Sequence, residues 1–411
     1  MPSKRWSYVV LGFIINLCLG TVYSWSAFRP FLHKEPYRLS PAESIMPFSL
    51  FLLVFGLTMP FSGLWIRKTG VRKPAIIGGF LTGLGYISCS LVGFSSLNPA
   101  FTLSVLYGVV AGLGVGIAYN VPITVSSTWI PDNRGLAVGL TVMGFGLSAL
   151  ITAPIATILL ETLGLSGAFL ALGAAFLSIL TVLGSLMKYP SQELSKASKA
   201  VSQTSIPSLT LREALKTPSF YSAWLIYFIG AGVGLMIIGS LKPIGLTLTR
   251  LEDAAATFVV SLLAVANASG RPLMGKIADI LTPKKTIILM FLLDILTLTL
   301  ILPLADNLYV LIAATVIVGV VFGGFLAVMP LITANFYGPL HLSSNYGALF
   351  TAYGFGGLTI PVLASILTEP KPTPEGYMKV FQTAAILTAI GLLAALLLKP
   401  PKRTGQGIQN P

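Results

Sequence analysis

Residues 265–272 read VANASGRP and lie inside an apolar run that extends from about 254 to 277. This run is long enough to cross a bilayer, which needs about 20 residues. Arg271 is then a permanent cation at membrane depth. Such a cation costs about 2.5–3.5 kcal/mol on insertion scales and usually faces a watery cavity. The alternative is an arginine near the helix end that extends to the lipid headgroups; Lys276 and Lys284 already mark the polar boundary further on, which favours the buried position.

Asn267 stands four residues before Arg271 and therefore shares its helical face. The pair offers a guanidinium fork and an amide, a combination that suits a carboxylate. We expect Arg271 to hold the carboxylate of a substrate and Asn267 to orient it.

The composition fits a membrane protein. Of the 411 residues, 55% are hydrophobic and only 9% are charged, with a mean hydropathy of +0.86. Soluble globular domains do not have this composition. The net charge of +13 does not indicate nucleic acid, because the basic residues fall in loops between apolar runs. Two cysteines in separate apolar runs and two histidines predict no disulfide framework, no metal site and no cofactor.

Twelve apolar runs predict an all-α membrane protein with twelve transmembrane helices. Glycine and proline recur inside them, as is usual in membrane helices. The predicted spans are 7–29, 45–66, 74–94, 99–127, 135–160, 167–187, 219–248, 254–277, 284–304, 308–335, 345–367 and 380–398.

The basic residues predict the orientation. With twelve spans, 18 of the 26 Lys and Arg residues fall on the side of both termini, 7 fall on the other side, and Arg271 lies between. Basic loops stay in the cytoplasm. We therefore expect a multi-pass protein of the cell inner (plasma) membrane, with both termini in the cytoplasm.

A polar stretch divides the chain into halves. We predict a first six-helix bundle at 1–188, a cytoplasmic linker at 189–218 and a second six-helix bundle at 219–411. Within the linker, 210–215 predicts a short amphipathic helix on the membrane surface.

The two halves repeat each other. Residues 60–63 (PFSG) match 272–275 (PLMG) at an offset of 212, and 141–146 (TVMGFG) match 351–356 (TAYGFG) at an offset of 210. Two matches at nearly one offset indicate duplication. Duplicated six-span halves are a transporter plan, with the substrate site between them at the midplane. This repeat predicts two pseudo-symmetric bundles.

The repeat is chemically asymmetric, because Arg271 corresponds to Met59 and Tyr353 corresponds to Met143. The second half therefore holds the charge that contacts the substrate.

Two tyrosines and two apolar residues of the spans are further site candidates. Tyr119 follows three alternating glycines, which allow close helix approach, and precedes Pro122; its hydroxyl is predicted to turn into the cavity, with packing as the alternative. Tyr23 closes the first span and is predicted to line the path. Phe322 and Leu326 share a face of the tenth span and form either an apolar wall or ordinary core.

The segment Pro131–Gly135 and the basic loops after Gly63 and Gly275 resemble the cytoplasmic loop signatures of the major facilitator superfamily. The resemblance implies that these loops hold the two halves together in one conformational state. The first copy departs from the pattern, because Arg67 stands where the family has Asp, whereas the second copy keeps Asp279.

Most of the chain also resembles the oxalate–formate antiporter family and its monocarboxylate-transporter relatives. The resemblance rests on Tyr23-Ser24-Trp25-Ser26, Tyr119, the Pro-Asp-x-Arg-Gly loop, Arg271-Pro272 and Asn345-Tyr346-Gly347. In oxalate exchangers a lysine stands at the position of Tyr353 and partners the eighth-span arginine. In monocarboxylate carriers an acidic residue stands one turn before that arginine, where this chain has Asn267.

The departure at Tyr353 predicts the charge of the cargo. Two fixed cations hold a dianion best, whereas a second buried cation left unpaired is costly. One arginine and a tyrosine hydroxyl suit a single carboxylate with a small polar or apolar tail.

We therefore predict a secondary active transporter of small monocarboxylates such as lactate, pyruvate or formate, coupled to a proton and working by alternating access as a monomer in membrane lipid. The alternative is an oxalate/formate-type organic anion antiporter. The predicted substrate-binding residues are Arg271, Asn267, Tyr119, Tyr353, Phe322, Leu326, Phe350, Phe145, Leu19 and Tyr23.

Two other classes of membrane protein, a receptor and an intramembrane enzyme, fit the sequence less well. A receptor on a transporter fold would often carry a large soluble appendage, and we expect none. An intramembrane enzyme needs a cluster of His, Asp or Glu within the spans, and the spans supply none. Asp294, inside the ninth span, is predicted to be structural or to lie at an interface, with a proton relay as the alternative.

Overall fold

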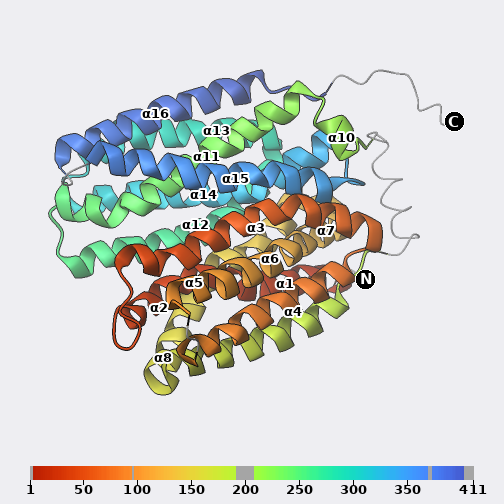
Figure 1. The fold of residues 1–411 in the computed structure, drawn as a ribbon. Helices are drawn as coiled ribbons and strands as arrows, with labels where there is room; N and C mark the ends of the chain where they lie inside the picture. Colours follow the sequence, from red (N-terminus) through yellow and green to blue (C-terminus); the bar gives the residue numbers. More distant parts are fainter. Residues whose placement is uncertain (1–2, 95–96, 191–207, 369–372, 402–411) are drawn as a thin grey trace.

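The computed structural model describes residues 3–94, 97–190, 208–368 and 373–401 (Figure 1). All regular secondary structure in these ranges is helical. Eleven of the helical stretches within them are long and apolar enough to cross a membrane. The predicted all-α membrane fold is therefore confirmed.

The first half is built from helices joined by short loops, and several membrane spans contain more than one helical segment. Its elements are α1 (Ser3–Leu19), the 3-10 helix η1 (Gly20–Ser24), α2 (Trp25–Leu32), α3 (Pro41–Thr69), α4 (Arg72–Cys89), the 3-10 helix η2 (Ser90–Phe94), α5 (Pro99–Leu103), the π-helix η3 (Ser104–Ala111), α6 (Gly112–Ala118), α7 (Asn120–Trp129), the 3-10 helix η4 (Pro131–Asn133) and α8 (Arg134–Leu186).

Two predicted spans are joined in α8. The apolar stretch Pro131–Leu186 has 56 residues, about 80 Å of helix, far more than the bilayer core of about 30 Å. Gly164 interrupts it with φ 68° and ψ −177°, a left-handed conformation that glycine adopts without steric cost. In Figure 1 the chain reverses within α8. Counting both arms of α8 gives the twelve predicted spans.

The second half has the same plan. Its elements are α10 (Leu211–Ala214), α11 (Pro218–Thr247), α12 (Asp253–Leu281), α13 (Pro283–Leu296), the π-helix η5 (Thr297–Ile301), the 3-10 helix η6 (Leu302–Leu304), α14 (Leu308–Tyr337), α15 (Leu342–Thr368) and α16 (Pro374–Leu397).

The two halves lie side by side (Figure 1). The first helix, α1, begins and the last helix, α16, ends at the same end of the bundle, which we call the terminal face; the other end is the opposite face. Two helix pairs form most of the boundary between the halves, α8 with α12 and α3 with α15. The offset of about 210 relates α3 to α12 and α8 to α15, so the repeat maps one pair onto the other.

Glycines allow these pairs to touch near the terminal face. A Cβ on Gly135 would collide with the carbonyl of Gly275, and a Cβ on Gly63 would collide with the carbonyl of Ser343. Gly63 and Gly275 are repeat partners at the offset of 212. The two boundaries are therefore built alike, which confirms the pseudo-symmetry predicted from the sequence.

Polar contacts join the two halves on the terminal face. The Asp279 carboxylate accepts hydrogen bonds from the backbone N–H of Gly135 at 2.7 Å and of Leu136 at 2.9 Å. These groups belong to the first turn of α8, where a carboxylate is favourable. The ammonium of Lys276 donates to Asn133 Oδ1 at 2.8 Å.

The matching corner of the other boundary uses neutral groups. Arg67 stands at the repeat position of Asp279 and cannot accept such bonds. Instead Asn120 Nδ2 donates to the Ser343 carbonyl at 2.7 Å, and Ser343 Oγ donates to the Gly63 carbonyl at 3.1 Å. We call these two sets of contacts latches. The latch at Asp279 is charged and the latch at Asn120 and Ser343 is neutral, and both join the first half to the second.

Replacing Asp279 with Asn should weaken closure of the terminal face. The amide loses the charge and one acceptor, at a cost of about 1–2 kcal/mol, or about 5- to 30-fold in the closed population. Labelling of a Ser343→Cys reporter, with Cys18 and Cys89 replaced by alanine, should speed up accordingly. Replacing Asp132, an exposed acid on the same face, should leave labelling unchanged. Equal labelling in both variants would contradict the latch.

The last part of the predicted linker, from residue 208 on, packs against the second half. Leu209 donates its N–H to the Tyr337 carbonyl at 2.9 Å and accepts from Asn345 Nδ2 at 3.0 Å. Thr210 and Glu213 form a reciprocal capping box that starts α10. The predicted short helix is therefore present and packs against α15. Residues 191–207 of the predicted linker lie outside the described residues, and the half boundaries at 188 and 219 stay predictions.

Candidate functional site

Arg271 lies between the halves, not at the headgroups. Its side chain belongs to α12 and has 0% of its surface exposed. The Nη1 group donates to the carbonyl of Val142 in α8 at 2.5 Å. A Cβ on Gly146 would lie 3.0 Å from Nε and 3.1 Å from Cζ, so this glycine leaves room for the guanidinium. Among the described Lys and Arg residues, Arg271 is the one that is fully buried.

One edge of this guanidinium has no partner. Nε and Nη2 are both buried and neither makes a hydrogen bond within the structure. These two nitrogens lie on the same edge, the one that binds a carboxylate through two parallel bonds. A buried charge left incompletely paired is costly. The edge is therefore suited to an anionic ligand.

Asn267 lies one turn before Arg271 on α12 and packs against α14. Its side-chain oxygen Oδ1 is buried without a partner and would lie 3.0 Å from a Cβ on Gly323. An amide oxygen accepts hydrogen bonds, so it suits a hydroxyl or a protonated group. Its predicted part in orienting the substrate stays a prediction.

Phe350 of α15 is the centre of an aromatic cluster that joins the halves. Its ring centroid lies 5.6 Å from Tyr119, 5.1 Å from Phe55 and 5.1 Å from Tyr353. Phe145 extends the cluster, 5.1 Å from Tyr119. The Arg271 charge interacts electrostatically with Tyr119 and Tyr353. The structure thus brings these predicted residues to one place beside the guanidinium.

Tyr353 makes a hydrogen bond that the sequence did not indicate. Its hydroxyl lies 2.9 Å from the hydroxyl of Tyr23, and this contact crosses from the second half to the first. The Tyr23 ring also lies edge-on to Phe145, with centroids 5.3 Å apart. Tyr23 and Tyr353 therefore bridge the halves through their hydroxyls.

Three predicted apolar residues are less clearly part of the site. Phe322 lies 6.5 Å from Tyr353 by ring centroids, and a Cβ on Gly234 would lie 2.5 Å from it, so it fills the space between α11, α14 and α15. Leu19 and Leu326 are buried in the shared core. Burial is expected both of a cavity wall and of ordinary packing, so these assignments stay predictions.

Three residues of the cluster were not predicted as substrate contacts. Phe55 of α3 stands at the repeat position of Asn267, so the offset of 212 could have found it. Tyr346 of α15 lies in the motif Asn345-Tyr346-Gly347 and has its ring 5.8 Å from Phe350. Tyr227 of α11 has its ring 6.1 Å from Phe350, and nothing in the sequence around it indicated that position.

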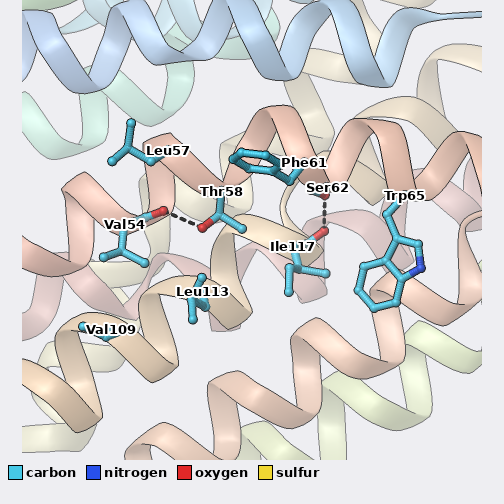
Figure 2. Close-up of a pocket in the computed structure, with 9 residues that line it drawn as sticks. All are labelled: Val54, Leu57, Thr58, Phe61, Ser62, Trp65, Val109, Leu113 and Ile117. Carbon is cyan, nitrogen blue, oxygen red and sulfur yellow. Dashed lines mark hydrogen bonds between the residues drawn. The ribbon is translucent and has the colours of Figure 1, made fainter.

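One surface groove lies elsewhere. Figure 2 shows this hollow of about 550 Å³. Thr58 and Ser62 are polar lining residues, and their hydroxyls donate to backbone carbonyls at 2.7 Å each. Phe61 is 71% exposed there, so the groove faces the lipid. It is lined by Val54, Leu57, Thr58, Phe61, Ser62, Trp65, Val109, Leu113 and Ile117. Its walls offer no group that would hold an anion.

Asp294 does not belong to the site around Arg271. It lies in α13, which packs against α14 and α16, and it is 5% exposed. The described residues hold no group of three His, Cys, Asp or Glu side chains that would bind a metal ion.

Comparisons with known proteins identify the family and the fold. A family model for the Major Facilitator Superfamily matches residues 10–250 and 247–411. The chain is 29% identical over 357 residues to an uncharacterized MFS-type transporter, YhjX, of Escherichia coli (strain K12), covering 86% of each. It is 28% identical over 413 residues to the oxalate:formate antiporter of Oxalobacter formigenes, covering 99% of this chain and 94% of the relative. Monocarboxylate transporter 2 of Meriones unguiculatus is 26% identical over 391 residues, covering 90% and 79%.

Solved structures share the fold. The transporter FucP in its outward conformation has a TM-score of 0.70 at 14% identity, covering 95% of this chain and 98% of FucP. The proton:xylose symporter XylE has a TM-score of 0.72 at 15% identity, covering 97% and 95%. At these identities the likeness shows the fold alone.

Proposed function

The chain belongs to the Major Facilitator Superfamily, and on that premise we propose that it carries small monocarboxylates such as lactate, pyruvate or formate across the membrane together with a proton. The family places it among multi-pass membrane transporters rather than enzymes. Its substrate class, its coupling and its orientation are our proposals.

The observation that carries the proposal is the unpartnered edge of Arg271. Its two nitrogens are buried at the boundary between the halves, where alternating access requires the substrate to sit. A carboxylate satisfies both nitrogens at once. Val142 holds the third nitrogen, Nη1, through its backbone carbonyl, and this bond orients the guanidinium.

The charge of the surroundings favours a monoanion. Within the described part of the chain, Arg271 is the one fully buried basic residue, and Tyr353 occupies the position where oxalate exchangers have lysine. A single carboxylate neutralises one guanidinium, whereas a dianion would keep one buried charge unpaired. Two of the similar proteins are named for oxalate:formate antiport and for monocarboxylate transport; formate and the monocarboxylates belong to this class, whereas oxalate is a dianion.

A proton is proposed to travel with the bound anion. The residues described around Arg271 are aromatic, amide or apolar, and the acids Asp279 and Asp294 lie at the terminal face and in α13. Arg271 and a neutral acid cannot form a tight ion pair, so release follows protonation of the carboxylate. This scheme needs no carboxylate relay of its own.

Uptake into proteoliposomes tests the coupling. An inward gradient of one pH unit supplies about 1.4 kcal/mol, so one-to-one symport should accumulate labelled lactate about tenfold. An ionophore that collapses the proton gradient should abolish the accumulation. Uptake that ignores the gradient would exclude symport.

Exchange of organic anions is the second candidate, and the likeness to the oxalate:formate antiporter over 99% of this chain favours it. Vesicles loaded with unlabelled formate should then take up labelled oxalate faster than empty vesicles. The tyrosine at position 353 predicts weak oxalate exchange, because no second cation partners the dianion. Fast oxalate counterflow would make exchange the main function.

We also propose a plasma-membrane location with the terminal face in the cytoplasm. The excess of basic residues on the side of both termini, 18 against 7, supports this orientation. A protomer with its own site between two covalently joined halves requires no partner chain, so we propose a monomer in membrane lipid.

A further inference from the structure

We propose that Tyr227 and Tyr346 form a second polar subsite beside Arg271, so that the preferred cargo is a monocarboxylate with a hydroxyl or keto oxygen next to its carboxylate. This inference rests on the proposed function and deepens it. It separates 2-hydroxy and 2-oxo acids from acids with plain alkyl tails.

The geometry places both hydroxyls in the aromatic cluster. Tyr227 comes from α11 and Tyr346 from α15, and their rings lie 6.1 Å and 5.8 Å from Phe350 by centroids. The ring of Tyr227 also lies 6.4 Å from Tyr353. Both tyrosines interact electrostatically with Tyr119 of the first half. The two rings therefore lie in the aromatic cluster that joins the halves.

Both hydroxyls are buried and poorly satisfied. Each side chain has 0% of its surface exposed, and neither hydroxyl makes a hydrogen bond of good geometry. They lie close enough to interact with each other; a hydrogen bond between them would still leave one O–H without an acceptor. Buried polar groups nearly always have partners in native proteins, and those that lack one require an explanation.

The neighbouring charge links this pair to the cargo. The guanidinium of Arg271 interacts electrostatically with Tyr346, and its Nε and Nη2 are also without partners. One ligand can satisfy both sets of groups if it carries a carboxylate and one more oxygen close to it. A tyrosine hydroxyl donates and accepts hydrogen bonds, so either a hydroxyl or a keto oxygen fits.

The alternative is a purely structural pair that stabilises the contact between α11 and α15. A structural pair would affect all cargoes equally, whereas a subsite affects only those with the second oxygen. The first half offers a matched control, because Tyr86 is also a buried tyrosine and stacks edge-on with Tyr107, with centroids 5.3 Å apart. That pair belongs to an aromatic core around Phe169 and Phe176.

The test compares L-lactate with propionate, which lacks only the hydroxyl, in proteoliposomes. Sites that hydrogen-bond a substrate hydroxyl discriminate strongly against analogues without it. We expect initial uptake of lactate at least about tenfold faster than propionate in the unmodified protein. In Y346F and Y227F the ratio should fall toward one, with propionate uptake unchanged. Y86F should keep the original ratio.

Four outcomes would overturn the proposal. Equal uptake of both acids by the unmodified protein would exclude a subsite for the second oxygen. A loss of both acids in Y346F and Y227F, or an unchanged ratio, would assign the pair to structure. In these cases Arg271 can still be required for uptake, and the proposed function then stands without the subsite. If the unmodified protein carries neither acid, the proposed function and this inference fail together.

Discussion

Uptake of lactate should fall about 10- to 100-fold when Arg271 is replaced with Lys, even though the positive charge is kept. Lysine is a point charge and cannot supply two parallel donors to one carboxylate. In this chain Nη1 donates a hydrogen bond to the Val142 carbonyl, whereas Nε and Nη2 have no partner within the structure. A lysine ammonium carries its donors on a single nitrogen, so it cannot both bind the Val142 carbonyl and present two parallel donors to the carboxylate. Each charged hydrogen bond lost costs about 1.5–3 kcal/mol.

Replacing Arg271 with Ala should have a larger effect. Removing one member of a buried, hydrogen-bonded charge pair costs about 2–5 kcal/mol, which corresponds to about 30-fold to several thousandfold in binding. Initial uptake rates in proteoliposomes measure both variants, and thermal unfolding confirms that each one folds. Lys285→Arg, the reverse exchange at an exposed position, should leave the rate unchanged. A wild-type rate in the Arg271→Lys variant would refute the assignment.

The fold was predictable because hydropathy alone requires it. Apolar runs of about 20 residues must be helices in lipid, since no other structure except a closed barrel satisfies their backbone groups there. The repeat of 60–63 in 272–275 then predicted two related halves, and the matching contacts of Gly63 and Gly275 confirm it. The burial of Arg271 followed from the same logic, because a cation inside a span needs an interior position.

Contacts between the halves were less predictable. The hydrogen bond between Tyr23 and Tyr353 joins residues 330 positions apart, and local patterns carry no information about such pairs. Tyr227 had no signal, because an aromatic residue in an apolar span is usually core. The predicted wall residues Leu19 and Leu326 illustrate the same limit, since sequence periodicity finds the buried face of a helix but not which neighbour it meets.

The two boundaries between the halves differ in chemistry. The α8–α12 pair contains the charges, with Arg271 at its centre and Asp279 at its end. The α3–α15 pair is aromatic, with the Phe55 ring tilted against that of Phe350 at 5.1 Å between centroids. A movement that separates α8 from α12 must break the bonds of Asp279 to the first turn of α8. We therefore expect the binding of an anion at Arg271 and the latch at Asp279 to be coupled.

The second large effect concerns Tyr353, the residue that we propose selects the charge of the cargo. Replacing Tyr353 with Lys should raise the preference for oxalate over lactate by about tenfold or more. Tyr353 lies within electrostatic range of Arg271 and is almost fully buried. A lysine there adds a second cation at a site screened from water. A dianion neutralises both cations, whereas a monoanion leaves one buried charge unpaired at a cost of several kcal/mol.

Counterflow of labelled oxalate and uptake of labelled lactate by the same vesicles measure this preference. Tyr353→Phe is the matched control, because it removes the hydrogen bond to Tyr23 without adding charge. If loss of that bond alone changed selectivity, the phenylalanine variant would show the same shift as the lysine variant. We expect it to change the rate for both acids and to keep their ratio. An oxalate preference in the unmodified protein, or none in the lysine variant, would show that charge at position 353 does not select the cargo.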